Sequence, residues 1–258
     1  GGFSRYTVDE NWLIPHFEKM LYDNSQIIEV LSYACQYNKN HLYKERVYQT
    51  IDWLLNNLYN KNGGFFSSID ADSENIEGKY YVWNTSELKN ILGNEYTLFQ
   101  EIYNVSEKGN WEGLNILNRL DEINLMSEET EVKIKKIREK LLQVRKKRIK
   151  PQIDDKILVD WNGITINSLA IASMVFKEKS WLEVAEKTYD LVTKNMSDSF
   201  HLKHILSEDA TYNAFASDYG HMCNAAITLY EITNEIKYLK NAKEWIKILN
   251  DEFIHKNG

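Results

Sequence analysis

Apolar residues recur at three- and four-residue steps along six stretches of the chain, the period of an α-helix with one buried face. The pattern predicts three pairs of helices joined by short polar turns: 23–37 with 42–58, 160–176 with 181–195, and 218–232 with 236–253. In the first pair the apolar steps extend back to Phe17, and Pro15 suits the first position of a helix. We therefore expect this helix to begin near Pro15 or His16.

The two helices of each pair differ in polarity. Residues 163–176 have almost no charge, whereas residues 180–195 alternate apolar and charged positions at helical spacing. An apolar helix belongs in the interior and an amphipathic one on the outside. A repeated hairpin with an inner and an outer helix indicates a ring or solenoid of αα units.

The pattern changes between the first and second pairs. The stretches 65–68 and 79–83 are short, aromatic and β-prone, so we expect a small β-hairpin there. Asn84 and Glu87 have the spacing of a capping box that starts a short helix, which Gly93 can end. Further helices are expected over 95–103 and 127–150. We treat residues 1–258 as one partial domain.

Composition limits the classes of function. Of 258 residues, 43% are hydrophobic and 27% charged, with a formal net charge of −7, which argues against a nucleic-acid partner. The basic run 145–148 is therefore interpreted as a solvated helix face. No apolar run approaches the roughly 20 residues that cross a bilayer. Cys35 and Cys223 form no C-x-x-C pair, so we expect buried free thiols and a cytoplasmic location.

Three aspartates occupy equivalent places near the starts of the inner helices: Asp23, Asp160 and Asp218. Repeat symmetry predicts that they lie on one rim of the ring. Carboxylates beside aromatic side chains suit sugar binding, because the rings cover C–H faces while carboxylates and amides bind hydroxyls. The neighbouring candidates are Trp161, Asn162 and Tyr219. The alternative is that each aspartate only caps its helix.

A second acidic group lies in the segment SIDADSENIEG, which contains Asp70, Asp72, Glu74 and Glu77. Alternating acids in a loop can bind a divalent cation, but the glycine and final glutamate do not match an EF-hand. The acids can instead supply a general acid, bind sugar hydroxyls, or stabilise a turn.

Histidine provides a third candidate. His16 lies beside Glu18 and can act as a proton shuttle, although a histidine hydrogen-bonded in the core is equally consistent with the sequence. His201 and His204 alone are a weak metal-binding signal. No nucleophile elbow, P-loop or dinucleotide fingerprint occurs, so we expect no metal and no organic cofactor.

Three stretches, 1–24, 63–83 and 145–170, resemble the family of spermatogenesis-associated protein 20, which includes thioredoxin-domain-containing proteins of the YyaL type. The resemblance implies an all-α fold, an (α/α) toroid similar to six-hairpin glycosidases and N-acylglucosamine 2-epimerases, incomplete in this chain and carrying a small β-hairpin insertion. It also implies carbohydrate chemistry. In the family a thioredoxin-like domain precedes this region. We therefore expect a piece of a longer protein, with that domain as a partner.

The resulting hypothesis is a glycoside hydrolase or sugar epimerase. Asp72 and Asp160 are predicted to face one cavity as acid and base, with Trp83 and Trp161 as sugar platforms and His16 as a further catalytic group. The alternative is a binding or scaffold region without catalysis. Two carboxylates within reach of each other favour the enzyme, whereas acids that are all capped or paired favour the scaffold.

Overall fold

The computed structural model describes residues 2–207 and 213–254. The chain divides into two compact units. Unit 1 comprises Gly1–Phe3, Met20–Ser68 and Ile153–Gly258, and unit 2 comprises Ser4–Lys19 and Ile69–Gln152. The prediction of one domain over residues 1–258 stays a prediction. In the part of the chain that is described, no helix combines the length and apolar character needed to cross a membrane.

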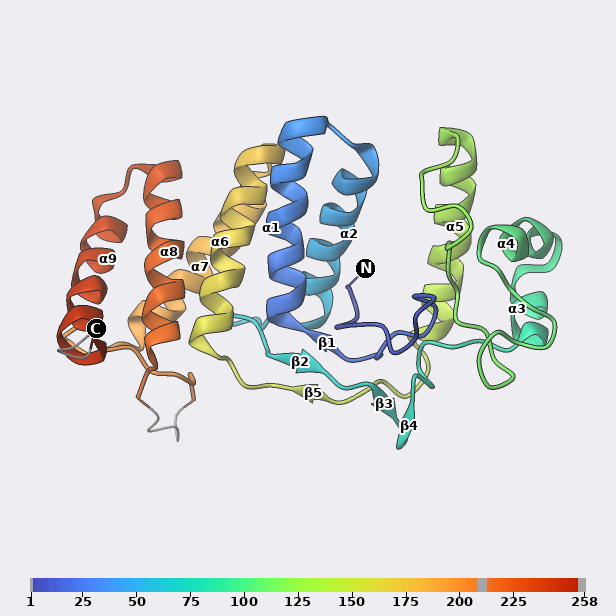
Figure 1. Ribbon diagram of the computed structural model, residues 1–258, viewed down its shortest axis with the longest axis horizontal. Coiled ribbons are helices and arrows are strands. Elements are labelled where there is room, and N and C mark those ends of the chain that lie inside the picture. Colours follow the sequence, from blue (N-terminus) through green and yellow to red (C-terminus); the bar gives the residue numbers. More distant parts are fainter. Residues whose placement is uncertain (1, 208–212, 255–258) are drawn as a thin grey trace. The chain divides into compact units, whose positions relative to one another are not determined.

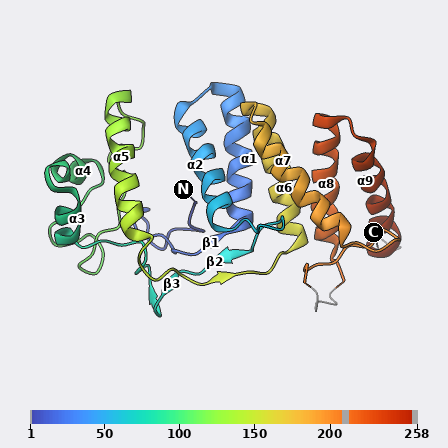
Figure 2. The same cartoon turned by 180° about the vertical axis from the view of Figure 1, so that it is seen from behind.

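Unit 1 consists of three helical hairpins: α1 (Leu21–Asn38) with α2 (His41–Asn57), α6 (Val159–Phe176) with α7 (Lys179–Lys194), and α8 (Ala216–Thr233) with α9 (Ile236–Ile248). A short π-helix, Leu249–Phe253, follows α9. Within each hairpin the two helices pack together, and the first helices also pack side by side in the order α1, α6, α8. Their N-terminal ends lie at the same end of this layer (Figures 1 and 2). The predicted hairpin repeat is thus confirmed.

Burial explains which helix of a hairpin is the inner one. Asp160 is the only charged residue of α6, and most positions of this helix are buried. By contrast, α7 buries a single stripe that contains Trp181, Ala185, Tyr189 and Val192. A helix that is apolar all round is stable only when other elements cover it, whereas a stripe needs one neighbour.

Helices α6 and α8 approach each other closely at Gly163. A Cβ atom at this position would lie 2.9 Å from the backbone carbonyl carbon of His221 and 3.1 Å from the backbone nitrogen of Met222. Gly163 is buried, and the atoms that a methyl group would meet are two backbone atoms of α8 and the Cβ of His221, which is fixed to that backbone. The absence of a side chain therefore sets the spacing between two inner helices.

We expect Gly163→Ala to lower the free energy of unfolding by about 1–3 kcal/mol, because the added methyl group must push α8 away. Chemical denaturation of the purified protein measures this change. Gly220→Ala is a matched control in α8, since a Cβ placed there meets no atom within 4 Å apart from its chain neighbours and the nearby backbone of its own helix. The control should be neutral or stabilising by up to about 1 kcal/mol through helix propensity. Equal effects at the two glycines would contradict the packing argument.

Unit 2 contains α3 (Thr85–Leu92), a 3-10 turn (Gly93–Glu95), α4 (Tyr96–Ile102) and α5 (Glu128–Arg145). Asn84 caps α3 by accepting a hydrogen bond from the Glu87 N–H at 2.7 Å, and Gly93 follows its last residue, as predicted. The three helices share a core built largely from aromatic and aliphatic side chains, including Trp83, Phe99, Ile134 and Leu141.

The first helix begins later than the sequence suggests, at Leu21 instead of Pro15 or His16. Pro15 forms a β-bridge with Thr7, and the His16 N–H donates to the Tyr6 carbonyl at 2.9 Å. The backbone of these residues therefore pairs with the preceding segment. The apolar positions from Phe17 to Leu21 reflect burial of a segment that is extended up to the helix, and their spacing coincides with the helical period.

The predicted small β-hairpin is present, but its strands are not the stretches 65–68 and 79–83. The hairpin strands are β3 (Asp72–Ser73) and β4 (Ile76–Glu77), which pair antiparallel, and Glu74 and Asn75 between them both have positive φ. In the aromatic stretch 79–83, residues 79–81 belong to a turn, and Trp83 forms an isolated antiparallel bridge with Asn115 instead of pairing with residues 65–68. Three other short strands, β1 (Lys19–Met20), β2 (Ser68–Ile69) and β5 (Ile153–Asp154), form a sheet in the order β1-β2-β5.

Candidate functional site

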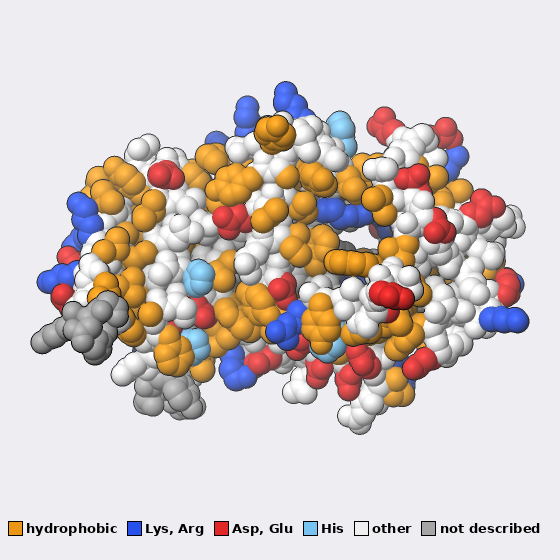
Figure 3. Space-filling view, viewed as in Figure 1, with side chains coloured by type: hydrophobic (Ala, Val, Ile, Leu, Met, Phe, Trp, Pro, Cys, Tyr) orange, Lys and Arg blue, Asp and Glu red, His pale blue; other side chains and the backbone are white. Residues whose placement is uncertain are grey.

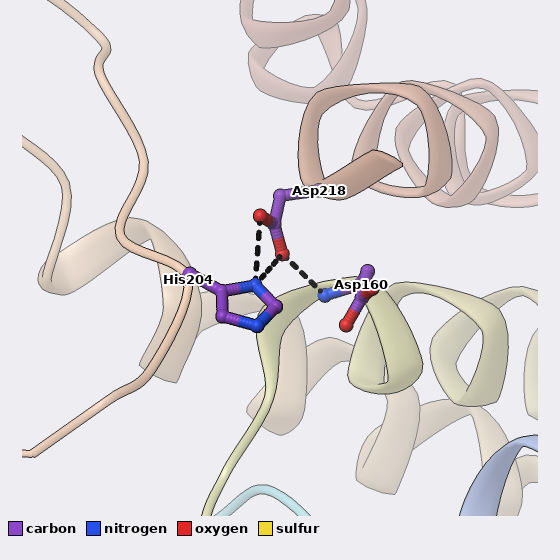
Figure 4. Close-up of side chains that lie close together, drawn as sticks. All are labelled: Asp160, His204 and Asp218. Carbon is purple, nitrogen blue, oxygen red and sulfur yellow. Dashed lines mark hydrogen bonds and ion pairs between the residues drawn. The ribbon is translucent and has the colours of Figure 1, made fainter. Parts of the chain in front are cut away.

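Three titratable side chains meet at the N-terminal ends of two inner helices of unit 1. Asp160 belongs to the first turn of α6, Asp218 to the first turn of α8, and His204 to the segment that precedes α8 (Figure 4). One potential ligand atom from each residue lies within 4.8 Å of the other two. We call this group the Asp160–His204–Asp218 cluster.

Asp218 is the centre of the cluster and has no exposed surface. Its Oδ1 accepts the backbone N–H of Asp160 at 2.8 Å, and its Oδ2 accepts the backbone N–H of Phe215 at 2.7 Å. His204 Nδ1 lies 3.1 Å from Oδ1 and 3.0 Å from Oδ2. The carboxylate therefore joins the ends of α6 and α8 and holds the imidazole, as the dashed lines in Figure 4 show.

The backbone around His204 is fixed independently of its side chain. The Val159 N–H donates to the His204 carbonyl at 2.9 Å, and the Leu206 N–H donates to the Ile157 carbonyl at 3.0 Å. These bonds pair the segment with the entry to α6. Two residues earlier, the Leu202 N–H donates to the Tyr219 hydroxyl at 3.2 Å. The segment is thus tied to both inner helices.

This geometry determines which histidine nitrogen is reactive. An ionised carboxylate only accepts hydrogen bonds, so Nδ1 of His204 carries the hydrogen that it donates to Asp218. Nε2 is then the basic nitrogen, and it has no hydrogen-bond partner among the described residues. An imidazole oriented in this way by a carboxylate is suited to general acid–base catalysis.

Asp160 is the more accessible carboxylate of the cluster. Its Oδ1 accepts the Trp161 N–H at 2.8 Å, and its Oδ2 lies 3.4 Å from the Ser217 hydroxyl, which donates to it. The side chain is part-buried, whereas Asp218 is fully enclosed. Of the two carboxylates, Asp160 is therefore the one able to contact a ligand directly.

The environment of Asp218 acts on its pKa in both directions. Burial raises the pKa above the ordinary value of 3.8 and is the largest influence, while the Phe215 N–H opposes this increase. The charge of Asp160 raises the pKa further, and His204 lowers it. The net direction is upward.

The same three residues are of the types that bind divalent metals. However, both oxygens of Asp218 already accept hydrogen bonds, and His204 Nδ1 points its hydrogen at that carboxylate. Binding an ion among these atoms would require removing those bonds and deprotonating Nδ1. The observed hydrogen bonding fits a proton-transfer group better than a metal centre.

Several residues predicted to bind substrate have side chains engaged within unit 1. Asn162 is fully buried, where its amide donates to the Phe65 carbonyl at 3.0 Å and accepts the Phe65 N–H at 2.8 Å. Tyr219 is 2% exposed. A ligand cannot reach either side chain without displacing the groups that cover it.

Two other predicted residues lie on the same layer of helices. Trp161 is part-buried on α6, where its ring meets Tyr22 of α1 edge to face with centroids 4.8 Å apart. Asp23 is part-buried in the first turn of α1. Their roles as substrate ligands stay predictions.

The remaining candidates belong to unit 2. Asp70 and Asp72 are exposed, and Asp70 accepts the Asp72 N–H at 3.3 Å. His16 is part-buried and stacks on Tyr6 with centroids 4.6 Å apart. Trp83 is 2% exposed beneath the Arg148 guanidinium, 4.0 Å from the ring centroid. Trp83 is therefore a core residue of unit 2.

The sequence pattern did not identify His204 as a site residue. It lies outside any periodic element, and its spacing from His201 suggests at most a weak metal motif. The available signal was its position ahead of an inner helix that begins with an acid. The thiols of Cys35 and Cys223 are buried and free, as predicted, and take no part in the cluster.

Comparisons with known proteins agree with the family resemblance. An uncharacterized protein of Caenorhabditis elegans is 29% identical over 304 aligned residues, which cover 100% of this chain and 41% of that protein. Spermatogenesis-associated protein 20 of Rattus norvegicus is 29% identical and that of Homo sapiens 28%, each over 97% of this chain and 37% of the relative. The chain thus spans about two fifths of these relatives. No family model matches it.

Solved structures confirm the predicted (α/α) toroid fold. Cellobiose 2-epimerase from Spirochaeta thermophila superposes on 97% of this chain with a TM-score of 0.58 and 16% identity, and that from Bacillus thermoamylovorans on 99% with 0.59 and 13%. An unsaturated glucuronyl hydrolase specific for heparin covers 96% of this chain with 0.56 and 12%. The chain covers 47%, 50% and 51% of these three structures.

Proposed function

We propose that this toroid region acts on a sugar by proton transfer, as a sugar epimerase or isomerase, with His204 as the base. The observation that carries the proposal is the hydrogen-bonded Asp218–His204 pair beside the carboxylate of Asp160. The similarity of the fold to cellobiose 2-epimerases supports a sugar as the substrate class.

The burial of Asp218 supports proton transfer over glycoside hydrolysis at this cluster. A retaining or inverting glycosidase needs two carboxyl groups that both reach the glycosidic bond or its attacking water. Asp218 has no exposed surface and three donors on its carboxylate, so it cannot serve as nucleophile or general acid. Its position is instead suited to orienting a histidine.

In the proposed reaction, His204 Nε2 takes the proton from the carbon next to the carbonyl of an open-chain sugar. The electron pair of the broken C–H bond forms a C=C bond to the carbonyl carbon, while the carbonyl π pair moves onto the oxygen to give an enediolate. The enediolate then turns its opposite face toward His204, and the imidazolium returns the proton from Nε2 to that face, which inverts the carbon and restores the neutral histidine. The Asp218 carboxylate stabilises the imidazolium that forms. Asp160 is assigned to bind sugar hydroxyls at the same edge.

Incubation of the protein with cellobiose, glucose and mannose in D2O tests this function, because proton abstraction replaces the C2 hydrogen with deuterium. We expect the NMR signal of C2–H to decrease with enzyme present. Release of glucose from cellobiose without deuterium at C2 would indicate a glycosidase and contradict the proposal. Absence of any change in all three sugars would also contradict it.

Asp160→Asn should lower the rate of this exchange by at least about tenfold, because the amide keeps the cap on Trp161 but removes the charge. Exchange rates followed by NMR measure the effect. Asp190→Asn is the matched control, since Asp190 lies on the outer helix α7 and pairs with Lys237 at 3.6 Å. An unchanged exchange rate in Asp160→Asn would contradict the proposed role of this carboxylate in substrate binding.

A second candidate function is a non-catalytic scaffold. It is favoured by the capping role of Asp218, whose carboxylate joins the ends of α6 and α8. In that case the sugars remain unchanged in D2O, and substitutions of His204 affect only stability.

A further inference from the structure

Phe215 immediately precedes α8 and exposes 57% of its surface. Single exposed aromatic side chains are common on protein surfaces, so the exposure of Phe215 is informative because of where this residue lies. Phe215 is also the residue whose N–H is held by Asp218 at 2.7 Å, so its backbone is anchored on the cluster while its ring is left open. Hydrophobic side chains lie beside a histidine at this end of α8 in Figure 3.

The ring of Phe215 contacts the ring of His204. Their centroids are 4.7 Å apart and their planes are inclined by 61°, an edge-type arrangement. His204 keeps 19% of its side-chain surface exposed. An exposed aromatic side chain therefore lies directly beside the histidine that carries the reactive nitrogen.

We infer that Phe215 is a substrate-stacking residue of this site and that the ligand is a pyranose whose face of C–H bonds lies on its ring. Aromatic faces attract the C–H side of a sugar ring, and its hydroxyl groups then point toward the polar groups of Asp160. The anchored backbone reduces the conformational freedom lost on binding. The inference rests on the proposed function, since it places a sugar at the Asp160–His204–Asp218 cluster.

Binding of methyl β-cellobioside tests the inference separately from catalysis, because this glycoside cannot open its reducing ring and so cannot be epimerised. Titration calorimetry with wild-type protein and Phe215→Ala should show about tenfold weaker binding in the variant. Phe215→Trp should retain binding. Tyr37→Ala is the control, since Tyr37 is 94% exposed at the far end of α1.

Saturation-transfer NMR supplies a readout that a purely structural role would not alter. The protons of one ring face of the sugar should receive more saturation than those of the other face, and this asymmetry should disappear in Phe215→Ala. Equal affinity of wild type and Phe215→Ala would overturn the inference, as would absence of glycoside binding by the wild-type protein. Deuterium exchange at C2 of free sugars would still support the proposed function in either case.

Discussion

Replacing His204 with glutamine should lower the exchange of sugar C2–H by about 10²- to 10⁴-fold, the usual contribution of a positioned general base. Glutamine can donate from its amide to Asp218, which preserves the hydrogen bond now made by Nδ1, but it supplies no basic nitrogen in place of Nε2. The rate in D2O measures the loss, and the melting temperature checks that the fold is retained.

His201→Gln is the matched control because it changes the same residue type three positions away. His201 pairs with Glu252 at 2.8 Å and does not belong to the cluster. Its replacement should leave exchange unchanged. If both histidine variants keep full activity, the base lies elsewhere and the proposed mechanism is wrong.

Asp218→Asn should reduce both activity and stability. An asparagine has one acceptor oxygen, so its amide group must face either the Asp160 N–H or the Phe215 N–H, leaving a buried donor without a partner at a cost of about 1–3 kcal/mol. If the amide also donates to His204, it favours the tautomer with hydrogen on Nε2, which cannot act as a base. Chemical denaturation and the exchange assay measure the two effects.

The stability difference between wild type and Asp218→Asn should depend on pH. Burial raises the pKa of Asp218 above 3.8, so the folded protein holds this proton more tightly than the unfolded chain. Such a group contributes stability that is fully present below the unfolded-state pKa and is lost as pH rises through the folded-state pKa. The advantage of wild type over the variant should therefore shrink as pH increases from about 4.

Denaturation curves of wild type and Asp218→Asn at increasing pH show directly whether their stability difference shrinks or grows. A difference that grows with pH would mean that the backbone N–H groups and His204 outweigh burial, and that the folded-state pKa is lowered instead. The stability of Asp190→Asn, a substitution on the exposed surface of α7, should differ from that of wild type by nearly the same amount at each pH. This control shows how much of the effect comes from removing one negative charge.

The hairpin repeat could be predicted from the sequence because the polarity of each helix is a local property. Residues 163–176 have no charged side chain, and a segment of that kind must be covered on all sides, so its role as an inner helix follows from composition and period alone. The same reasoning failed where a helix and a buried extended segment give the same spacing of apolar residues. The apolar steps after Pro15 fit a helix, but the backbone of His16 pairs with Tyr6 in an extended arrangement that depends on a segment ten residues earlier.

The sequence by itself determined the helical hairpins, their inner and outer members, and the placement of Asp160 and Asp218 in the first turns of neighbouring helices. Only the tertiary structure decided which groups meet. Asp218 and His204 are hydrogen-bonded because the segment before α8 pairs with the entry to α6, a contact between residues more than 40 positions apart. Periodicity describes one element at a time, whereas a site depends on the distances between elements, which packing sets.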